Sequence, residues 1–113
     1  MTENTDKQLY EGMYILNATL SEEARGKALD RIQTGITGRG GEMLKIHDLG
    51  RKKLAYPIQR SREGHYYLLY FQAAAEVMRE LWREYHLNED LLRFMTLRTE
   101  EVKDELKFKQ LPE

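Results

Sequence analysis

The sequence of 113 residues predicts an α+β domain in which two helices cover one face of a four-stranded antiparallel sheet. Its hydrophobic pattern changes along the chain in the order strand, helix, strand, strand, helix, strand. Pro57 lies inside the second strand, and because proline has no amide hydrogen, that strand belongs at a sheet edge or carries a bulge. The third strand is apolar on both faces, which is typical of a central strand.

The first half of the chain supplies one strand and one helix. Aromatic and branched residues predict a strand over Leu9–Leu16. An amphipathic helix is predicted over Ser21–Thr37, with Ser21 as its N-cap, because apolar residues then recur every four positions. These positions are Leu20, Ala24, Ala28, Ile32 and Ile36. Gly38–Gly41 ends the helix, since glycine readily adopts the left-handed conformation found after a helix.

The second half supplies a hairpin, a helix and a last strand. The second strand begins near Glu42 and has a predicted kink around Asp48–Gly50. Ser61–Gly64 is predicted to be the hairpin turn, with a positive φ at Gly64. The elements that follow are a third strand (His65–Gln72), a helix that opens at Ala73 and runs to His86, and a fourth strand (Leu91–Arg98).

Two right-handed crossovers in this order give the ferredoxin-like, or split β-α-β, sheet with strand order 4-1-3-2. The second strand then lies at an edge, as Pro57 requires. Both helices cover the same face, so one set of side chains from the third strand must point to the open face. That set is either Tyr66, Leu68 and Tyr70 or Tyr67, Leu69 and Phe71. An apolar open face favours contact with a partner.

The chain is organised as one domain with two polar ends. Residues 1–8 are expected to form a disordered leader, residues 9–98 the folded domain, and residues 99–113 a charged arm. The absence of cysteine excludes disulfides and thiolate metal sites. No apolar run is long enough to span a membrane and no signal-peptide core is present, so we expect a soluble, cytoplasmic protein.

The most unusual segment is Leu49–Arg62, which holds five cations and no acid in a chain of net charge -1. The cations are Arg51, Lys52, Lys53, Arg60 and Arg62. Such a segment is either a charged sheet edge that prevents aggregation or a local site for a polyanion. Because the whole chain is nearly neutral, tight binding to nucleic acid would need a more basic partner.

The sequence contains no recognisable enzyme motif. His47, His65 and His86 lack the spacing of a helical metal pair, and no nucleophile elbow or phosphate-binding glycine loop occurs, so we predict no catalytic residue, metal or cofactor. Residues 17–21 also lack the arginine of an acylphosphatase phosphate loop. Two binding classes stay open: an RNA-recognition motif, whose signature Gly64–Tyr70 partly matches, and a regulatory ligand-binding domain.

Several segments resemble the bacterial small-subunit ribosomal protein S-six family. The main one is Gly50–Ile58, with the sequence GRKKLAYPI. The others, in the same order as in the family, are Tyr10-Glu11, Gly40–Glu42, Glu63–Tyr67 and Leu87–Met95. Together they cover roughly Leu9 to Arg98. Gln59 and His65 depart from the family pattern.

The resemblance implies a non-catalytic domain that binds small-subunit ribosomal RNA in the central domain, as a heterodimer with ribosomal protein S-eighteen. It implies no membrane and no small-molecule substrate. The candidate rRNA-binding residues are Arg51, Lys52, Lys53, Arg60 and Arg62, with Arg93 and Arg98 on the opposite edge strand as weaker candidates. The candidate partner-binding residues are Tyr56, Pro57 and Ile58. Tyr56 shares its parity with Leu54 and Ile58, which favours a core position over a stacking platform.

Overall fold

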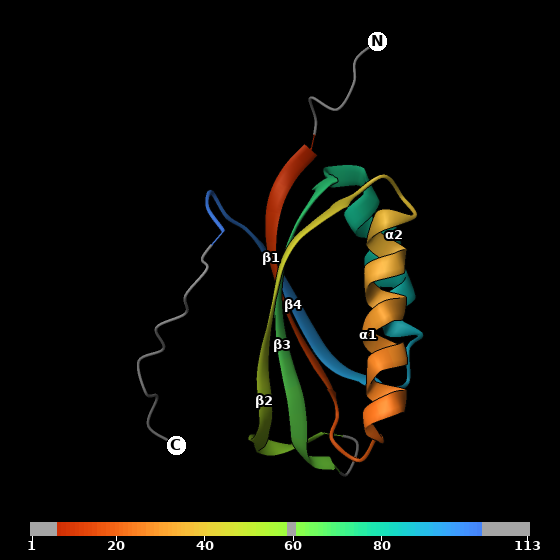
Figure 1. Cartoon of the computed structure of the whole chain (residues 1–113), viewed down its shortest axis with the longest axis vertical. Coiled ribbons are helices and arrows are strands. Elements are labelled where there is room, and N and C mark those ends of the chain that lie inside the picture. Colours follow the sequence, from red (N-terminus) through yellow and green to blue (C-terminus); the bar gives the residue numbers. More distant parts are fainter. Residues whose placement is uncertain (1–6, 59–60, 103–113) are drawn as a thin grey trace.

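The computed structural model describes residues 7–58 and 61–102 (Figure 1). Their elements are β1 (Lys7–Asn17), α1 (Glu22–Thr37), β2 (Glu42–Ile58), β3 (Ser61–Ala74), α2 (Ala75–His86) and β4 (Leu91–Arg98). The order of strands and helices is the one that the sequence predicts. Within the described residues, no helix is long and apolar enough to cross a membrane.

The four strands form a single sheet in the order β2-β3-β1-β4, with all three neighbouring pairs antiparallel. This is the predicted order 4-1-3-2, taken from the other edge. Figure 1 shows both helices on the same side of the sheet. The ferredoxin-like prediction is therefore confirmed, and β2, which contains Pro57, is an edge strand as expected.

Helix α1 begins and ends at the predicted signals. The Ser21 hydroxyl oxygen accepts a hydrogen bond from the Ala24 amide at 3.1 Å and so satisfies one free donor of the first turn. After the helix, Gly40 has a φ of 85°, the left-handed conformation that glycine adopts most easily. Ala28, Ile32 and Ile36 are the buried apolar residues of this helix.

The main core fills the space between the helices and the sheet. It consists of Tyr10, Tyr14, Leu16, Ala28, Ile32, Ile36, Tyr67, Leu69, Phe71, Ala73, Leu81, Tyr85 and Leu91. The set Tyr67, Leu69 and Phe71 therefore faces the helices, which decides between the two sets that the sequence left open. Tyr14 meets Tyr85 edge to face, with ring centres 5.2 Å apart and hydroxyl oxygens 2.8 Å apart.

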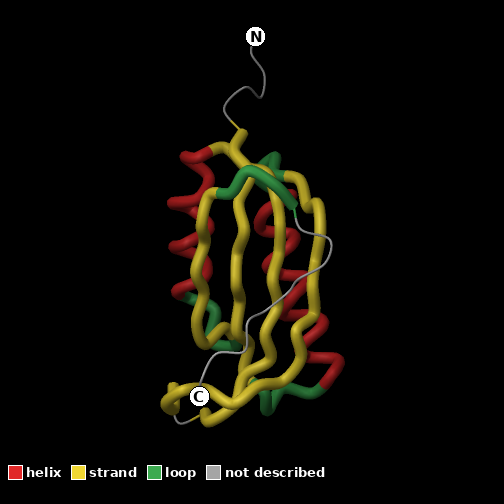
Figure 2. Tube along the Cα trace, turned by 90° about the vertical axis from the view of Figure 1, so that its left-hand side faces the viewer, coloured by secondary structure: helices red, strands yellow, loops and turns green. Residues whose placement is uncertain are grey.

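A second, smaller cluster lies on the face of the sheet that the helices leave open. Ile15 alternates with Tyr14 and Leu16 along β1, so it points away from the main core. It packs with Leu54 and Leu92, and Ile58 and Tyr66 lie against them. Figure 2 shows the ends of β2 and β3 turned across this end of the sheet. The cluster thus forms beneath the basic end of β2.

Three sequence-based boundaries need correction. Ser61–Gly64 is the start of β3 and not a turn, and Gly64 is not among the glycines with positive φ. A Cβ atom at Gly64 would overlap the Ile15 side chain, so glycine is needed there for space. Lys7 and Gln8, expected in the leader, belong to β1, and the second helix begins at Ala75, two residues later than predicted. The rest of the leader and residues 103–113 of the arm lie outside the described residues.

Candidate nucleic-acid and partner interface

The basic half of β2 is paired to β3 and exposed to solvent. Arg51, Lys52 and Lys53 lie opposite His65, Gly64 and Glu63, respectively, and all three cations are exposed. The strand bends just before them, at Gly50, where φ is 84° and the register shifts. The predicted kink is therefore present, and it aims the basic segment away from the line of the first half of β2.

Not all of this charge is equally available to a ligand. The Arg51 Nε lies 2.5 Å from the Glu63 Oε1 across the strand pair, and both side chains are largely exposed. An exposed ion pair of this kind contributes little to stability, but it offsets part of the Arg51 charge. Lys53 is exposed further along β2, and Arg62 is exposed on β3.

The register of the hairpin slips beyond Lys53. Between the pairs Lys53–Glu63 and Ile58–Ser61, β2 has four residues and β3 has one. The extra residues of β2 bulge out of the ladder, and Pro57, which cannot donate a ladder hydrogen bond, lies among them. The strict alternation of side chains therefore ends here.

This bulge explains why the prediction of a core position for Tyr56 is wrong. Leu54 is buried and Ile58 is half-buried, but Tyr56, which shares their parity, is 60% exposed. Only Leu54 and Ile58 belong to the small cluster with Ile15 and Leu92. The bulge thus holds a tyrosine ring outside the sheet while its neighbours on both sides are anchored beneath it.

The hairpin of β2 and β3 turns across the open face, so that the end of β2 reaches β4 on the opposite edge of the sheet. The guanidinium carbon of Arg93, on the opposite edge strand β4, lies 5.7 Å from the centre of the Tyr56 ring. This is the distance of a cation–π contact. The sequence predicts these residues on opposite edges, and the structure brings Tyr56 and Arg93 together on the open face of the sheet.

The other candidate residues have different outcomes. Arg98 is exposed at the end of β4 that pairs with Tyr10, whereas Arg93 pairs with Ile15 near the hairpin, so Arg98 lies away from Tyr56 and Arg93. Arg60 lies outside the described residues. Pro57 is exposed and Ile58 is half-buried in the cluster under the hairpin.

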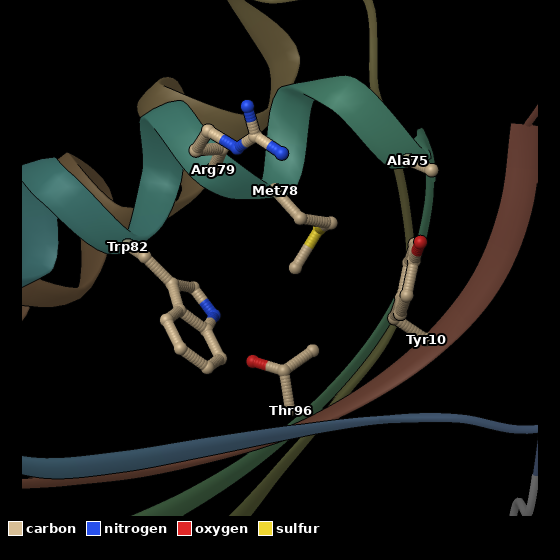
Figure 3. A pocket seen from close by; sticks show the side chains of 6 residues that line it. All are labelled: Tyr10, Ala75, Met78, Arg79, Trp82 and Thr96. Atoms are coloured by element: carbon tan, nitrogen blue, oxygen red, sulfur yellow. The ribbon is translucent and has the colours of Figure 1, made fainter.

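Two hollows lie between helix α2 and β4. One, of about 320 Å³, is lined by Tyr10, Ala75, Met78, Arg79, Trp82 and Thr96 (Figure 3). The other, of about 540 Å³, lies further along β4 and includes Arg93 and Met95 in its wall. Trp82 borders both. Among the described residues no group of His, Asp or Glu side chains is arranged to hold a metal ion.

The third strand does not present the aromatic surface of an RNA-recognition motif. Tyr66, Leu68 and Tyr70 form the set on the open face, since their neighbours on β3 face the helices. Tyr70 is fully buried, and its hydroxyl donates a hydrogen bond to the Glu11 carboxylate at 2.6 Å. A base could not stack on this ring, so the arrangement disfavours that alternative.

The family model and the relatives compared with this chain all point to the same protein family. The family model described as Ribosomal protein S6 matches residues 9–98. The chain is 62% identical over 107 residues to small ribosomal subunit protein bS6 of Protochlamydia amoebophila strain UWE25, covering 95% of this chain and 94% of that protein. It is 64% identical over 106 residues to the bS6 protein of Chlamydia abortus, covering 94% and 95%, respectively.

Solved structures agree with this comparison. The crystal structure of 30S ribosomal protein S6 from Thermotoga maritima superposes with a TM-score of 0.77 at 30% identity, over 82% of this chain and 88% of that one. The C-terminal domain of the MgtC protein from Mycobacterium tuberculosis, at 14% identity and a TM-score of 0.52, shares the fold alone. The chain belongs to the ribosomal protein S6 family of the small ribosomal subunit.

Proposed function

We propose that this protein binds small-subunit ribosomal RNA in the central domain, as a heterodimer with ribosomal protein S-eighteen, in the cytoplasm. The observation that carries the proposal is the exposed run Arg51–Lys53 on a sheet edge, with the exposed Arg62 on the same hairpin. Lys and Arg side chains release condensed counterions when they contact phosphates, and this is the main source of affinity for nucleic acid. The role is structural, without catalysis or cofactor.

The charge of the chain supports the need for a partner. The formal net charge is -1, so beyond the basic hairpin the protein attracts RNA poorly. Within the hairpin, Glu63 already offsets part of the Arg51 charge. A basic partner bound beside β2 would extend the phosphate-binding surface, and the two proteins would bind RNA together better than either alone.

The edge of β2 is the proposed place for that partner. β2 pairs with β3 on one side only, and the described part of the chain has no strand on its other side. Pro57 is exposed there, and Ile58 is half-buried in the cluster beneath the hairpin. An extended partner segment would pair with the backbone groups on the outer edge of β2 and contact Pro57 and Ile58.

The test is a gel-shift titration of a central-domain fragment of small-subunit ribosomal RNA, with and without ribosomal protein S-eighteen, at two salt concentrations. We expect tight binding only with the partner. Replacing Arg51, Lys52 and Lys53 by alanine should weaken it. The slope of log affinity against log salt should also become shallower, by up to about 0.9 for each phosphate that the variant no longer neutralises.

A matched control removes the same charge from the helix layer. Lys27 and Arg31 on α1 and Arg83 on α2 are exposed, and alanine is well tolerated in helices. The triple alanine variant should bind RNA nearly as well as the natural chain. Equal weakening by both triple variants would mean that net charge alone acts. Tight binding to single-stranded RNA without the partner would favour the RNA-recognition alternative.

A further inference from the structure

We propose that Tyr56 and Arg93 form a stacking platform for one unpaired nucleobase of the bound RNA. The inference rests on the proposed RNA binding and adds a base contact to the phosphate contacts of the basic strand. It changes the expected role of Tyr56 from partner contact to RNA contact. Tyr56 and Arg93 are an exposed ring and a cation that meet on the open face of the sheet.

The exposure and shape of the pair suit a flat ligand. Tyr56 is 60% exposed, although a tyrosine ring usually buries most of its apolar surface in a domain of this size. The Arg93 guanidinium lies 5.7 Å from the ring centre. Tyrosine rings and arginine guanidinium groups are the flat surfaces on which proteins stack unpaired bases. The pair offers both kinds of surface at one place.

The backbone around Tyr56 is preorganised. Tyr56 directly precedes Pro57, and the proline ring restricts the backbone of the residue before it to extended conformations. Leu54 and Ile58, two residues before and after, pack with Ile15 of β1 and Leu92 of β4 beneath the hairpin. The bulge is thus fixed at both ends, so the ring is held out at a lower entropic cost than on a free loop.

The charge around the ring also fits a nucleotide. Arg93 places a cation at the ring itself, and the same strand as Tyr56 carries Arg51, Lys52 and Lys53, of which Arg51 is paired with Glu63. A base carries its phosphate with it, so this charge suits a nucleotide better than the apolar or basic side chain of a protein. Stacking tolerates any base, so the platform favours an unpaired position over a particular sequence.

The experiment uses the full-length protein with ribosomal protein S-eighteen and the central-domain RNA fragment. The fluorescent base 2-aminopurine replaces the unpaired bases of the fragment, one position at a time. Stacking on an aromatic ring changes its emission. We expect one position at which the natural protein quenches the 2-aminopurine emission. The Tyr56→Phe variant should also quench it there, and the Tyr56→Leu variant should not.

Affinity gives the second readout. Tyr56→Leu should weaken RNA binding by about 5- to 150-fold, the range for loss of one base–aromatic stack. Arg93→Lys, which keeps the charge and loses the plane, should weaken it less than Arg93→Gln. Trp82→Leu is the control, because Trp82 is also exposed but lies on α2. Circular dichroism confirms that each variant folds.

The outcomes separate this inference from the proposed function. RNA binding in which no 2-aminopurine position depends on Tyr56 would overturn the stacking platform and leave the proposed function standing. If Tyr56→Leu weakens the binding of ribosomal protein S-eighteen without RNA by the same factor as it weakens RNA binding, the ring contacts the protein and the platform is wrong. No RNA binding by the natural chain with its partner would overturn both.

Discussion

The hydroxyl oxygens of Tyr14 on β1 and Tyr85 on α2 lie 2.8 Å apart inside the main core. This hydrogen bond joins the sheet to the helix layer, and the two rings also meet edge to face. A buried hydroxyl needs such a partner, because leaving it without one costs part of its lost hydration. The pair therefore combines apolar burial with a satisfied polar contact.

Burial of this pair predicts a loss of stability at high pH. Burial raises the pKa of Tyr85 to about 12 and that of Tyr14 well above its usual value. In the unfolded chain both should titrate near pH 10. The contribution of the pair is thus complete below about pH 10 and is lost as the pH rises through about 12.

Two measurements test this expectation. The free energy of unfolding by urea should fall between about pH 10 and pH 12 and fall less steeply in Tyr85→Phe. The absorbance of the Tyr85 tyrosinate is the part of the signal that is missing in Tyr85→Phe. It should develop near pH 12 in the folded protein. A titration of that absorbance near pH 10, in protein that is still folded, would contradict the predicted shift.

Removal of either hydroxyl should destabilise the fold, and the losses of stability in the two single variants should not be additive. Tyr14→Phe or Tyr85→Phe leaves the other buried hydroxyl without its partner, at a cost of about 1–3 kcal/mol. In the double variant neither hydroxyl of the pair remains, so the total loss should be smaller than the sum of the two single losses. Urea unfolding of the four proteins gives the coupling energy. Additive losses would show that the hydrogen bond does not join the two residues energetically.

Most of the fold could be predicted from the sequence because local signals agreed with the topology. The Ser21 cap, the four-residue apolar repeat of α1 and the position of Pro57 are each visible in the sequence and present in the structure. The limits of β4, Leu91–Arg98, are the predicted ones. Each of these features depends on interactions within a few residues or within one element.

The candidate site was harder to predict because it depends on contacts between distant segments. The bulge after Lys53 breaks the two-residue period that predicted a core position for Tyr56. Nothing in the local sequence shows that Ile15 and Leu92 anchor the hairpin from beneath. For the same reason, the contact between Arg93 and Tyr56 could not be read from their positions on opposite edge strands. The glycine at position 64 suggested a turn, although its role is steric.

Gly64→Ala should destabilise the protein through crowding. The new Cβ would overlap the Ile15 Cγ2 and lie 3.6 Å from the Leu54 Cδ2, in the cluster beneath the basic hairpin. Overpacking of this kind costs about 1–3 kcal/mol. Gly26→Ala is the control, because its Cβ would meet nothing within 4 Å on α1 and should stabilise the helix by about 0.5–1 kcal/mol. Urea unfolding that shows no loss in Gly64→Ala would mean that Ile15 moves aside freely.

Substitution of Gly50 should also destabilise the protein, but through backbone strain and not through crowding. A Cβ there meets nothing within 4 Å, but φ is 84°, a conformation that costs ordinary residues roughly 1–2 kcal/mol. Asparagine tolerates this conformation better than alanine, so Gly50→Asn should be more stable than Gly50→Ala. At Gly64 the order should reverse, because φ is not positive there and the larger side chain crowds Ile15 more. Urea unfolding of these four variants tests both orders, and the same order at both positions would refute the distinction between strain and crowding.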